Sequence, residues 1–398
     1  MKKFIYTLLI SCAIFSCKQQ KESSKEIFSE QKKEIHNTDK IKELDSLIHG
    51  LITSKKTLGV SYAIQFQNDS LVTKNYGFTS VDSDKKIANT SQFRIASITK
   101  SFTATAIIQL MEKGKLNFED KLDTFFPNFP NGDKITIYHL LSHTSGLSNW
   151  YEFKMPDNVP AIFPLCPKPQ QYLKEIHKTT LFEPGKLYSY SNSGYVLLGE
   201  LIEQLSGMSY ETYLDTYIFN PSGMLHTELE RNPKDLKEGV EGYAYNEDAD
   251  PPFVSPISYP MPFSAGALRS TTLDLLKFLK SFNSNKLINE ENRLKMTKYA
   301  INTDGVEIDE SIFYYPKDFK KQKQPKGLER FGYGLGFSCM KMFGTETVSH
   351  SGFIAGFRSL MLYVPKSGVS FSILLNTELH EDEMDTWMQI QKKIIELE

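Results

Sequence analysis

Cysteine and tryptophan are scarce in this chain of 398 residues, which contains four cysteines and two tryptophans. Small secreted scaffolds that depend on disulfides are much denser in cysteine, so the chain does not belong to that class. An excess of charge is also lacking, because 46 Lys and Arg residues stand against 48 Asp and Glu residues. Without a long basic run, we expect no nucleic acid among the partners of this protein.

Long hydrophobic runs are lacking as well. The apolar run Phe4–Phe15 is too short to span a bilayer, and it follows two lysines, as in an export signal. Its end resembles a bacterial lipoprotein signal, with Cys17 as the acylated first residue of the mature protein. The residues before Cys12 fit the pattern that precedes the acylated cysteine of such signals better, but acylation there would leave a very short hydrophobic stretch. A plain secretory signal without acylation is the other alternative.

These observations predict three parts of the chain. Residues 1–16 are expected to be a lipoprotein signal peptide, residues 17–38 a polar tether, and residues 39–398 the folded domain. We therefore expect an exported cell-envelope lipoprotein, in the bacterial periplasm or outer membrane, that is attached to the membrane by a lipid on Cys17.

The folded part has an ordinary globular composition, since the chain is 40% hydrophobic and 24% charged. Strand patterns occur near both ends of this part, and a mostly helical stretch over roughly residues 117–260 lies between them. One sheet built from both ends, with the helical part inserted, predicts a mixed α/β (α+β) fold. The predicted helices include 41–52, 137–141, 170–177, 195–205, 273–282 and 384–395, and the predicted strands are 60–65, 70–76, 334–338, 346–350, 357–364 and 369–376.

A serine and a lysine three residues apart, Ser97 and Lys100, begin a long apolar helical run. Residues at this spacing share a helix face, and burial lowers the pKa of a lysine, so the amine can take the proton of the serine. The pair therefore indicates acyl transfer through a serine ester, and a helix cap is the alternative role for Ser97. Three other serines have the same spacing to a lysine but open no such run: Ser29, Ser83 and Ser338.

Two later segments supply further groups for such a site. Tyr190 and Asn192 form the one Tyr-x-Asn of the chain, and they offer a phenol that can relay protons and an amide that can bind a peptide-like substrate. At the end of a predicted strand, His350 and Ser351 supply an imidazole and a hydroxyl, while Gly352 lets a substrate backbone approach. A capped pre-helix loop and a strand-end turn are the respective structural alternatives.

The remaining histidines and cysteines predict neither a metal site nor a cofactor. His139 and His143 are four residues apart, as metal ligands on a helix can be, but no third ligand pattern accompanies them. We interpret residues 140–147, a helix that ends in a Gly-containing loop, as structural. Cys166 and Cys339 could form a disulfide or remain free.

Three segments, Ser97–Lys100, Tyr190–Asn192 and His350–Gly352, follow one another in the order and separations of the serine β-lactamase-like hydrolases. The chain resembles this family over roughly residues 40–395. Its members include class C β-lactamases, D-alanyl-D-alanine carboxypeptidases, D-aminopeptidases and related esterases. The resemblance implies an antiparallel sheet flanked by helices, a mostly helical domain beside it, an active site in the cleft between them, and no metal or organic cofactor.

The resemblance also implies roles for individual residues. Ser97 would be the nucleophile, Lys100 would help to deprotonate it, and Tyr190 would act as a base and then protonate the leaving group. Asn192 would contact the substrate amide, and the third segment would lie on the edge strand of the sheet. The backbone N–H groups of Ser97 and Phe353 would form the oxyanion hole.

The third segment departs from the pattern of most β-lactamases, which have a lysine at this point. Lysine is a fixed cation suited to a β-lactam carboxylate, whereas His350 is largely neutral near neutral pH. The departure favours hydrolysis of D-amino-acid peptides or small esters over β-lactamase activity. Two rival interpretations are a non-catalytic envelope lipoprotein that binds cell-wall or peptide ligands, and a metallohydrolase that uses His139 and His143.

Overall fold

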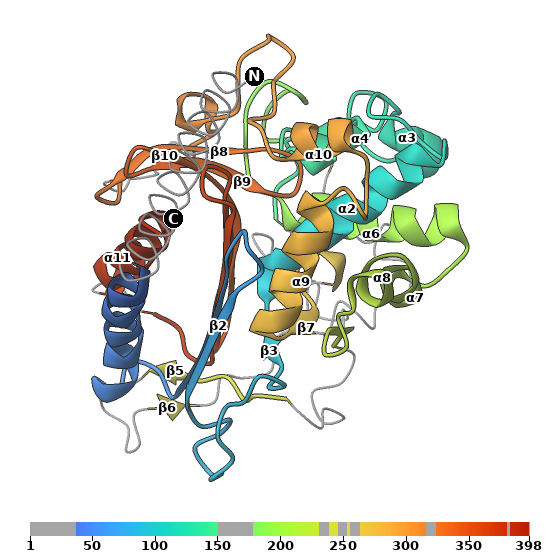
Figure 1. Cartoon of the computed structure of the whole chain (residues 1–398). Coiled ribbons are helices and arrows are strands. Elements are labelled where there is room, and N and C mark those ends of the chain that lie inside the picture. The colour runs from blue at the N-terminus through green and yellow to red at the C-terminus, as the bar shows by residue number, and fades with distance from the viewer. Residues whose placement is uncertain are drawn as a thin grey trace, which may run out of the picture.

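A seven-stranded antiparallel sheet in the order β2-β1-β12-β11-β10-β9-β8 is the centre of the molecule (Figure 1). The computed structural model describes residues 37–149, 178–230, 239–245, 253–254, 263–315, 324–379 and 383–397. Two strands come from the beginning of the folded part and five from its end, which confirms the predicted sheet built from both ends. The strands are β1 (Gly59–Gln65), β2 (Leu71–Gly77), β8 (Leu328–Tyr333), β9 (Ser338–Met342), β10 (Thr345–Ile354), β11 (Phe357–Val364) and β12 (Val369–Leu375).

Two helices cover one face of this sheet: the helix over residues 37–53 and α11 (Met384–Ile395). Their apolar stripes pack on side chains of β1, β11 and β12 in one buried cluster. The first helix is also tied to the sheet by a carboxylate, since Asp45 Oδ1 accepts hydrogen bonds from the hydroxyls of Tyr62 (2.8 Å) and Tyr76 (2.5 Å). The two helices therefore form a layer that covers one face of the sheet.

The opposite face of the sheet carries the helical part of the chain, which lies on the right in Figure 1. Its longer helices are α2 (Thr99–Glu112), α6 (Asn192–Ser206) and α9 (Thr272–Asn283), and its shorter ones are α3 (Leu122–Phe125), α4 (Ile137–Leu141), α7 (Tyr210–Leu214), α8 (Asn220–Ser222) and α10 (Glu290–Met296). Single helical turns are η1 (Ala96–Ile98), η4 (Asp215–Phe219), η6 (Phe263–Ala265) and η7 (Glu310–Ile312). Small sheets are β3 (Phe93–Arg94) with β7 (Leu268–Ser270) and β4 (Glu228–Leu229), and β5 (Ala244–Tyr245) with β6 (Phe253–Val254).

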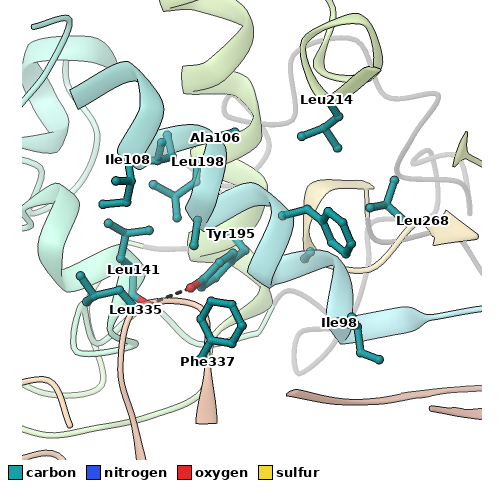
Figure 2. Close-up of a cluster of buried hydrophobic side chains, with 14 of the residues drawn as sticks. Ile98, Ala106, Ile108, Leu141, Tyr195, Leu198, Leu214, Leu268, Leu335 and Phe337 are labelled. Atoms are coloured by element: carbon teal, nitrogen blue, oxygen red, sulfur yellow. Dashed lines mark hydrogen bonds between the residues drawn. The ribbon is translucent and has the colours of Figure 1, made fainter. Parts of the chain in front are cut away.

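Helix α2 is enclosed on all sides, because its residues 99–110 are all buried. Apolar side chains of α6 and of the segment before β9 pack around it, as Figure 2 shows. Within this cluster, the hydroxyl of Tyr195 donates to the carbonyl oxygen of Leu141 at 2.8 Å, so its polar end is satisfied. A helix packed in this way gives any side chain on its first turn a fixed position.

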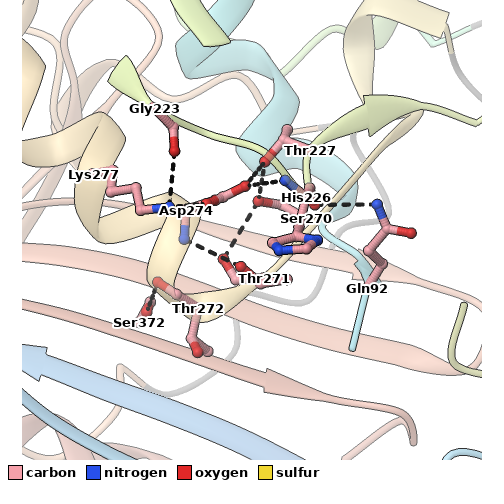
Figure 3. A network of polar contacts seen from close by, with 10 residues as sticks. All are labelled: Gln92, Gly223, His226, Thr227, Ser270, Thr271, Thr272, Asp274, Lys277 and Ser372. Atoms are coloured by element: carbon pink, nitrogen blue, oxygen red, sulfur yellow. Dashed lines mark hydrogen bonds and ion pairs between the residues drawn. The ribbon is translucent and has the colours of Figure 1, made fainter. Parts of the chain in front are cut away.

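Helix α9 begins at a threonine cap, since Thr271 Oγ1 accepts from the backbone N–H of Asp274 at 3.2 Å. The buried carboxylate of Asp274 accepts from His226 N at 2.7 Å and from Thr227 Oγ1 at 3.0 Å (Figure 3). Ser372 Oγ of β12 donates to a carbonyl of the same helix at 2.8 Å. The start of α9 therefore joins the helical part to the sheet.

One predicted strand, over residues 334–338, is wrong. Residues 334–337 form a bend between β8 and β9, and strand structure resumes at Ser338. Gly336 has φ +81°, and a Cβ atom there would lie 2.4 Å from the Cβ of Ala104 on α2. The glycine permits a close approach to the helix, a contact that the local pattern of residues does not reveal.

Candidate active site

Ser97 and Lys100 meet at the start of α2. Ser97 lies on the turn η1 and is partly exposed, whereas Lys100 is on the first turn of α2 and is fully buried. The Nζ atom of Lys100 is 3.2 Å from Ser97 Oγ. The alternative role of Ser97 as a helix cap is wrong, because the cap positions of η1 and α2 are Ile95 and Ile98.

The turn that carries Ser97 is anchored from the side of β3. Arg94 on β3 donates to the buried carboxylate of Glu230 from Nε at 2.8 Å and from Nη2 at 2.7 Å, and Arg269 of β7 donates to the same carboxylate at 2.8 Å. The next residue after Ile95, Ala96, has φ +47°, in the left-handed region that residues with a side chain rarely adopt. Strained backbone of this kind persists where the surroundings fix it, and it is common beside reactive groups.

The amine of Lys100 has two further partners. Its Nζ atom is 2.6 Å from Asn192 Oδ1 and 2.6 Å from the carbonyl oxygen of Ala265. Burial lowers the pKa of Lys100 well below its ordinary value. A neutral amine has two N–H donors and one lone pair, which match these two acceptors and the hydroxyl of Ser97. The arrangement can therefore take the proton of Ser97.

Tyr190 and Asn192 both lie close to the amine of Lys100. The Tyr190 ring centroid is 4.8 Å from Lys100 Nζ, and both Tyr190 and Asn192 are partly exposed. Asn192 is the first residue of α6, and Ser191 caps that helix by accepting from Gly194 N at 3.2 Å. The side-chain nitrogen of Asn192 makes no hydrogen bond to the residues that the structure describes, so it can bind a substrate.

His350 is buried and neutral. Its Nδ1 atom is 2.7 Å from the carbonyl oxygen of Ser351, which only accepts, so Nδ1 carries the proton and Nε2 accepts from the Tyr333 hydroxyl at 2.9 Å. Burial lowers the pKa of His350 to about 3. Ser351 is exposed. The third segment therefore presents no fixed positive charge on its histidine.

Gly352 lies directly against the turn that carries Ser97. A Cβ atom on Gly352 would be 2.2 Å from the carbonyl oxygen of Ile95 and 2.2 Å from Ser359 Oγ. Ser359 Oγ itself donates to this carbonyl at 2.9 Å. The missing side chain therefore lets β10 approach the turn η1, and the space is filled by protein.

Strand β10 is not the edge strand that the resemblance implied, because it lies between β9 and β11. Its pairing with β9, however, ends at Ser349 opposite Ser338, and residues 350–354 pair with β11. On the side of β9, this second half of the strand has no ladder partner among the described strands. The backbone of this half is thus the part of β10 that can pair with a bound chain.

The loop after α4 contacts the backbone of the segment that carries Tyr190 and Asn192. His143 accepts a hydrogen bond from Ser191 N at 3.1 Å, which agrees with a structural interpretation of residues 140–147, and Asn149 binds both neighbours of Ser191. A histidine or asparagine that binds backbone groups has no recognisable spacing, so the sequence carries no signal for it. His139 instead forms a capping box with Thr136 at the start of α4.

Several predictions fall on residues that the structure does not describe. The signal peptide, most of the tether, the helix over residues 170–177, Cys17 and Cys166 lie outside the described residues. Cys339 is buried on β9 and has a free thiol. In the described ranges, no His, Cys, Asp or Glu residues gather in a group of three or more that could hold a metal ion. No helix in the same ranges is both long and apolar enough to cross a membrane.

The chain belongs to the Beta-lactamase family, whose sequence model matches residues 44–393. The protein is therefore a member of a fold family of serine hydrolases, as the sequence motifs predict. It is 31% identical to Penicillin-binding protein 4* of Bacillus subtilis over 274 residues, which are 64% of this chain and 58% of that protein. It is 28% identical over 72% of its length to the putative penicillin-binding protein PbpX of the same organism, of which 69% is covered.

Solved structures agree with this assignment. The octameric penicillin-binding protein homologue of Pyrococcus abyssi superposes with a TM-score of 0.71 at 26% identity, over 88% of this chain and 76% of that one. D-amino acid amidase of Ochrobactrum anthropi SV3 has a TM-score of 0.71 at 23% identity, over 89% of this chain and 98% of the amidase. The amidase shares the fold, which confirms the predicted β-lactamase-like architecture.

Proposed function

We propose that this protein hydrolyses an amide or ester bond through an acyl-enzyme on Ser97, without a metal or an organic cofactor. The observation that carries the proposal is the buried amine of Lys100, which lies 3.2 Å from Ser97 Oγ and is held by Asn192 Oδ1 and the carbonyl of Ala265. Burial favours the neutral form of this amine, which is the form that can accept a proton.

In the proposed reaction, the neutral amine of Lys100 accepts the proton of Ser97 as Oγ attacks the carbonyl carbon of the substrate. The phenol of Tyr190 protonates the leaving amine or alcohol when its bond to the carbonyl carbon breaks, and the Lys100 ammonium then returns a proton to the phenolate. Water attacks the ester in the second half of the reaction. The amine of Lys100 accepts a proton from this water, and Ser97 Oγ leaves and takes that proton back from the Lys100 ammonium.

The proposed oxyanion hole consists of the backbone N–H groups of Ser97 and Phe353. Ile354 and Phe357 face each other across a two-residue turn and are expected to form a hydrogen-bonded pair. Because bonded and non-bonded pairs alternate along antiparallel strands, Phe353 opposite Arg358 is expected to direct its N–H away from β11. That direction is the side of β10 on which β9 has already ended.

The proposed substrates are D-amino-acid peptides or amides, followed by small esters. The neutral, buried His350 offers no fixed cation to the carboxylate of a β-lactam, which favours these substrates over β-lactamase activity. The similarity to penicillin-binding proteins and to the fold of a D-amino acid amidase supports a substrate with a peptide-like carbonyl.

Hydrolysis assays with p-nitrophenyl acetate and with D- and L-phenylalanine amide test this proposal. We expect Ser97→Ala to lower kcat/KM about a thousandfold or more, because removing a nucleophile has effects of this order or larger. Ser83→Ala is the matched control, since Ser83 has the same spacing to a lysine but lies in an exposed turn region. Equal rates in Ser97→Ala and the wild type would contradict the proposal. A folded wild type without activity on any of these compounds would favour the non-catalytic ligand-binding lipoprotein.

Export and lipid attachment are the second part of the proposal, and they rest on the run Phe4–Phe15 that ends before Cys17. Protein produced in a bacterial host should carry a diacylglyceryl thioether on an N-terminal Cys17 and should fractionate with membranes. Mass spectrometry of the N-terminal peptide measures this modification, and Cys17→Ala should be released from the membrane fraction. An unmodified mature N-terminus, or a lipid on Cys12, would contradict it.

A further inference from the structure

The segment that carries Tyr190 and Asn192 is held along its backbone by two residues of the loop after α4, His143 and Asn149, through both side chains and the backbone carbonyl of His143. Both are buried. Together they bind one backbone group of each of four consecutive residues. The contacts are Ser189 N to the carbonyl oxygen of His143 (3.0 Å), Asn149 Nδ2 to the carbonyl oxygen of Tyr190 (3.2 Å), Ser191 N to His143 Nδ1 (3.1 Å), and Asn192 N to Asn149 Oδ1 (2.7 Å).

The His143 ring also packs directly against the aromatic side chains of the site. Its centroid is 4.3 Å from that of Tyr190, 4.7 Å from that of Tyr333 and 5.0 Å from that of Tyr195. Because Nδ1 accepts from a backbone N–H, the ring is neutral with its proton on Nε2, and burial lowers its pKa well below the ordinary value. One imidazole thus contacts the Tyr190 ring and binds the backbone of the residue that follows it.

Two features of His143, its backbone conformation and the environment of its Nε2 atom, are energetically unfavourable. His143 has φ +60°, a left-handed conformation that is unusual for a residue with a side chain. Its Nε2 atom is buried and has no hydrogen-bond partner among the residues that the structure describes, and unsatisfied buried groups are rare in native structures. Strain and an unpaired polar group that are retained together beside reactive side chains favour a functional reason for the residue.

We infer that His143 and Asn149 are positioning residues for acyl transfer, an inference that rests on the proposed function. They fix the backbone that carries the Tyr190 ring, whose centroid is 4.8 Å from Lys100 Nζ, and the Asn192 amide, whose oxygen accepts from Lys100 Nζ. Asn192 transmits the effect directly, since its N–H is bound by Asn149 and its Oδ1 is bound by the lysine amine. A shift of this backbone would move the phenol and the amine relative to Ser97, and displacements of about 1 Å can cost about a hundredfold in rate.

The test compares His143→Phe with His143→Asn. Phenylalanine keeps the ring but cannot accept from Ser191 N, whereas the side-chain oxygen of asparagine lies near the position of Nδ1 and can accept. We expect His143→Phe to lower kcat about a hundredfold with KM within about threefold of the wild type, and His143→Asn to recover at least about tenfold of this loss. The rate at which a fluorophosphonate phosphonylates Ser97 should fall in parallel. Asn149→Ala should act in the same direction as His143→Phe.

His139→Phe is the matched control, because His139 is another buried histidine of the same region whose Nδ1 accepts from a backbone N–H, that of Thr136. It should lower thermal stability without changing kcat per folded molecule. An unchanged kcat in both His143 variants, or a loss that only follows the unfolded fraction, would overturn the inference. If His143→Phe does not fold, the ratio of His143→Asn to His143→Ala decides by the same criterion. A wild type that the fluorophosphonate does not label would instead refute the proposed function.

Discussion

Replacing Lys100 with methionine is expected to lower kcat/KM for an amide or ester about a thousandfold, within the range of about 10² to 10⁴ that general acid–base catalysis contributes. Methionine fills a similar volume in the buried site but cannot take the proton of Ser97, whose Oγ is 3.2 Å from Nζ. Steady-state hydrolysis by the wild type and the variant measures the effect. Lys113→Met, at the far end of α2, is the control and should keep the wild-type rate. A Lys100→Met protein within tenfold of the wild type would contradict the proposed base.

The same variant is expected to change how stability depends on pH. Burial holds the pKa of Lys100 well below its ordinary value of 10.5 in the fold, so below pH 10.5 the unfolded chain binds a proton that the folded chain does not. The wild type therefore loses stability relative to Lys100→Met as the pH falls below 10.5, until the pKa of the folded state is passed. Urea unfolding at about pH 9 and about pH 7 should show this difference growing at the lower pH. A constant difference would indicate an ordinary lysine.

Adding one methyl group at Gly352 is the other change with a large expected effect. The Cβ atom of Gly352→Ala would lie 2.2 Å from the carbonyl oxygen of Ile95, so β10 and the turn with Ser97 must move apart. This movement would displace Ser97 from the N–H of Phe353. We expect kcat/KM to fall about a hundredfold. The free energy of unfolding should fall by about 1–3 kcal/mol, as overpacked sites do.

Gly50→Ala is the matched control for this substitution. Gly50 lies in the helix over residues 37–53, and a Cβ atom there would meet nothing within 4 Å. Alanine should keep the activity and raise the free energy of unfolding by about 0.5–1 kcal/mol, because glycine weakens a helix interior. Urea unfolding and ester hydrolysis measure both variants. Wild-type activity in Gly352→Ala would show that the close approach of β10 does not set the geometry of the site.

The segments that the sequence predicts well are those whose pattern is local. The predicted strand 357–364 coincides with β11, and the predicted helix 273–282 lies within α9, which its own cap at Thr271 begins. The segment over residues 334–338 was predicted wrongly because its conformation depends on a distant contact, the packing of Gly336 on α2. A contact with a residue that is distant in the sequence cannot be predicted from the local pattern of residues.

The residues of the candidate site also differ in how well the sequence predicts them. The i, i+3 spacing predicts that Ser97 and Lys100 are neighbours, because helix geometry alone brings them together. The contact of Lys100 with Asn192, 92 positions later, follows from the fold alone, since the family resemblance implies only that Asn192 contacts the substrate amide. His143 and Asn149 could not be predicted, since backbone groups look alike in every sequence and a side chain that binds them leaves no motif.

The most direct test of the central claim is to map the residue that a fluorophosphonate modifies in the full chain. After digestion, mass spectrometry should find the phosphonyl adduct on Ser97 in the wild type. Labelling of Lys100→Met should be much slower, because the hydroxyl of Ser97 then lacks the amine 3.2 Å away that takes its proton. An adduct on another residue, or equal labelling rates for the wild type and Lys100→Met, would contradict a nucleophile at Ser97 that this amine activates.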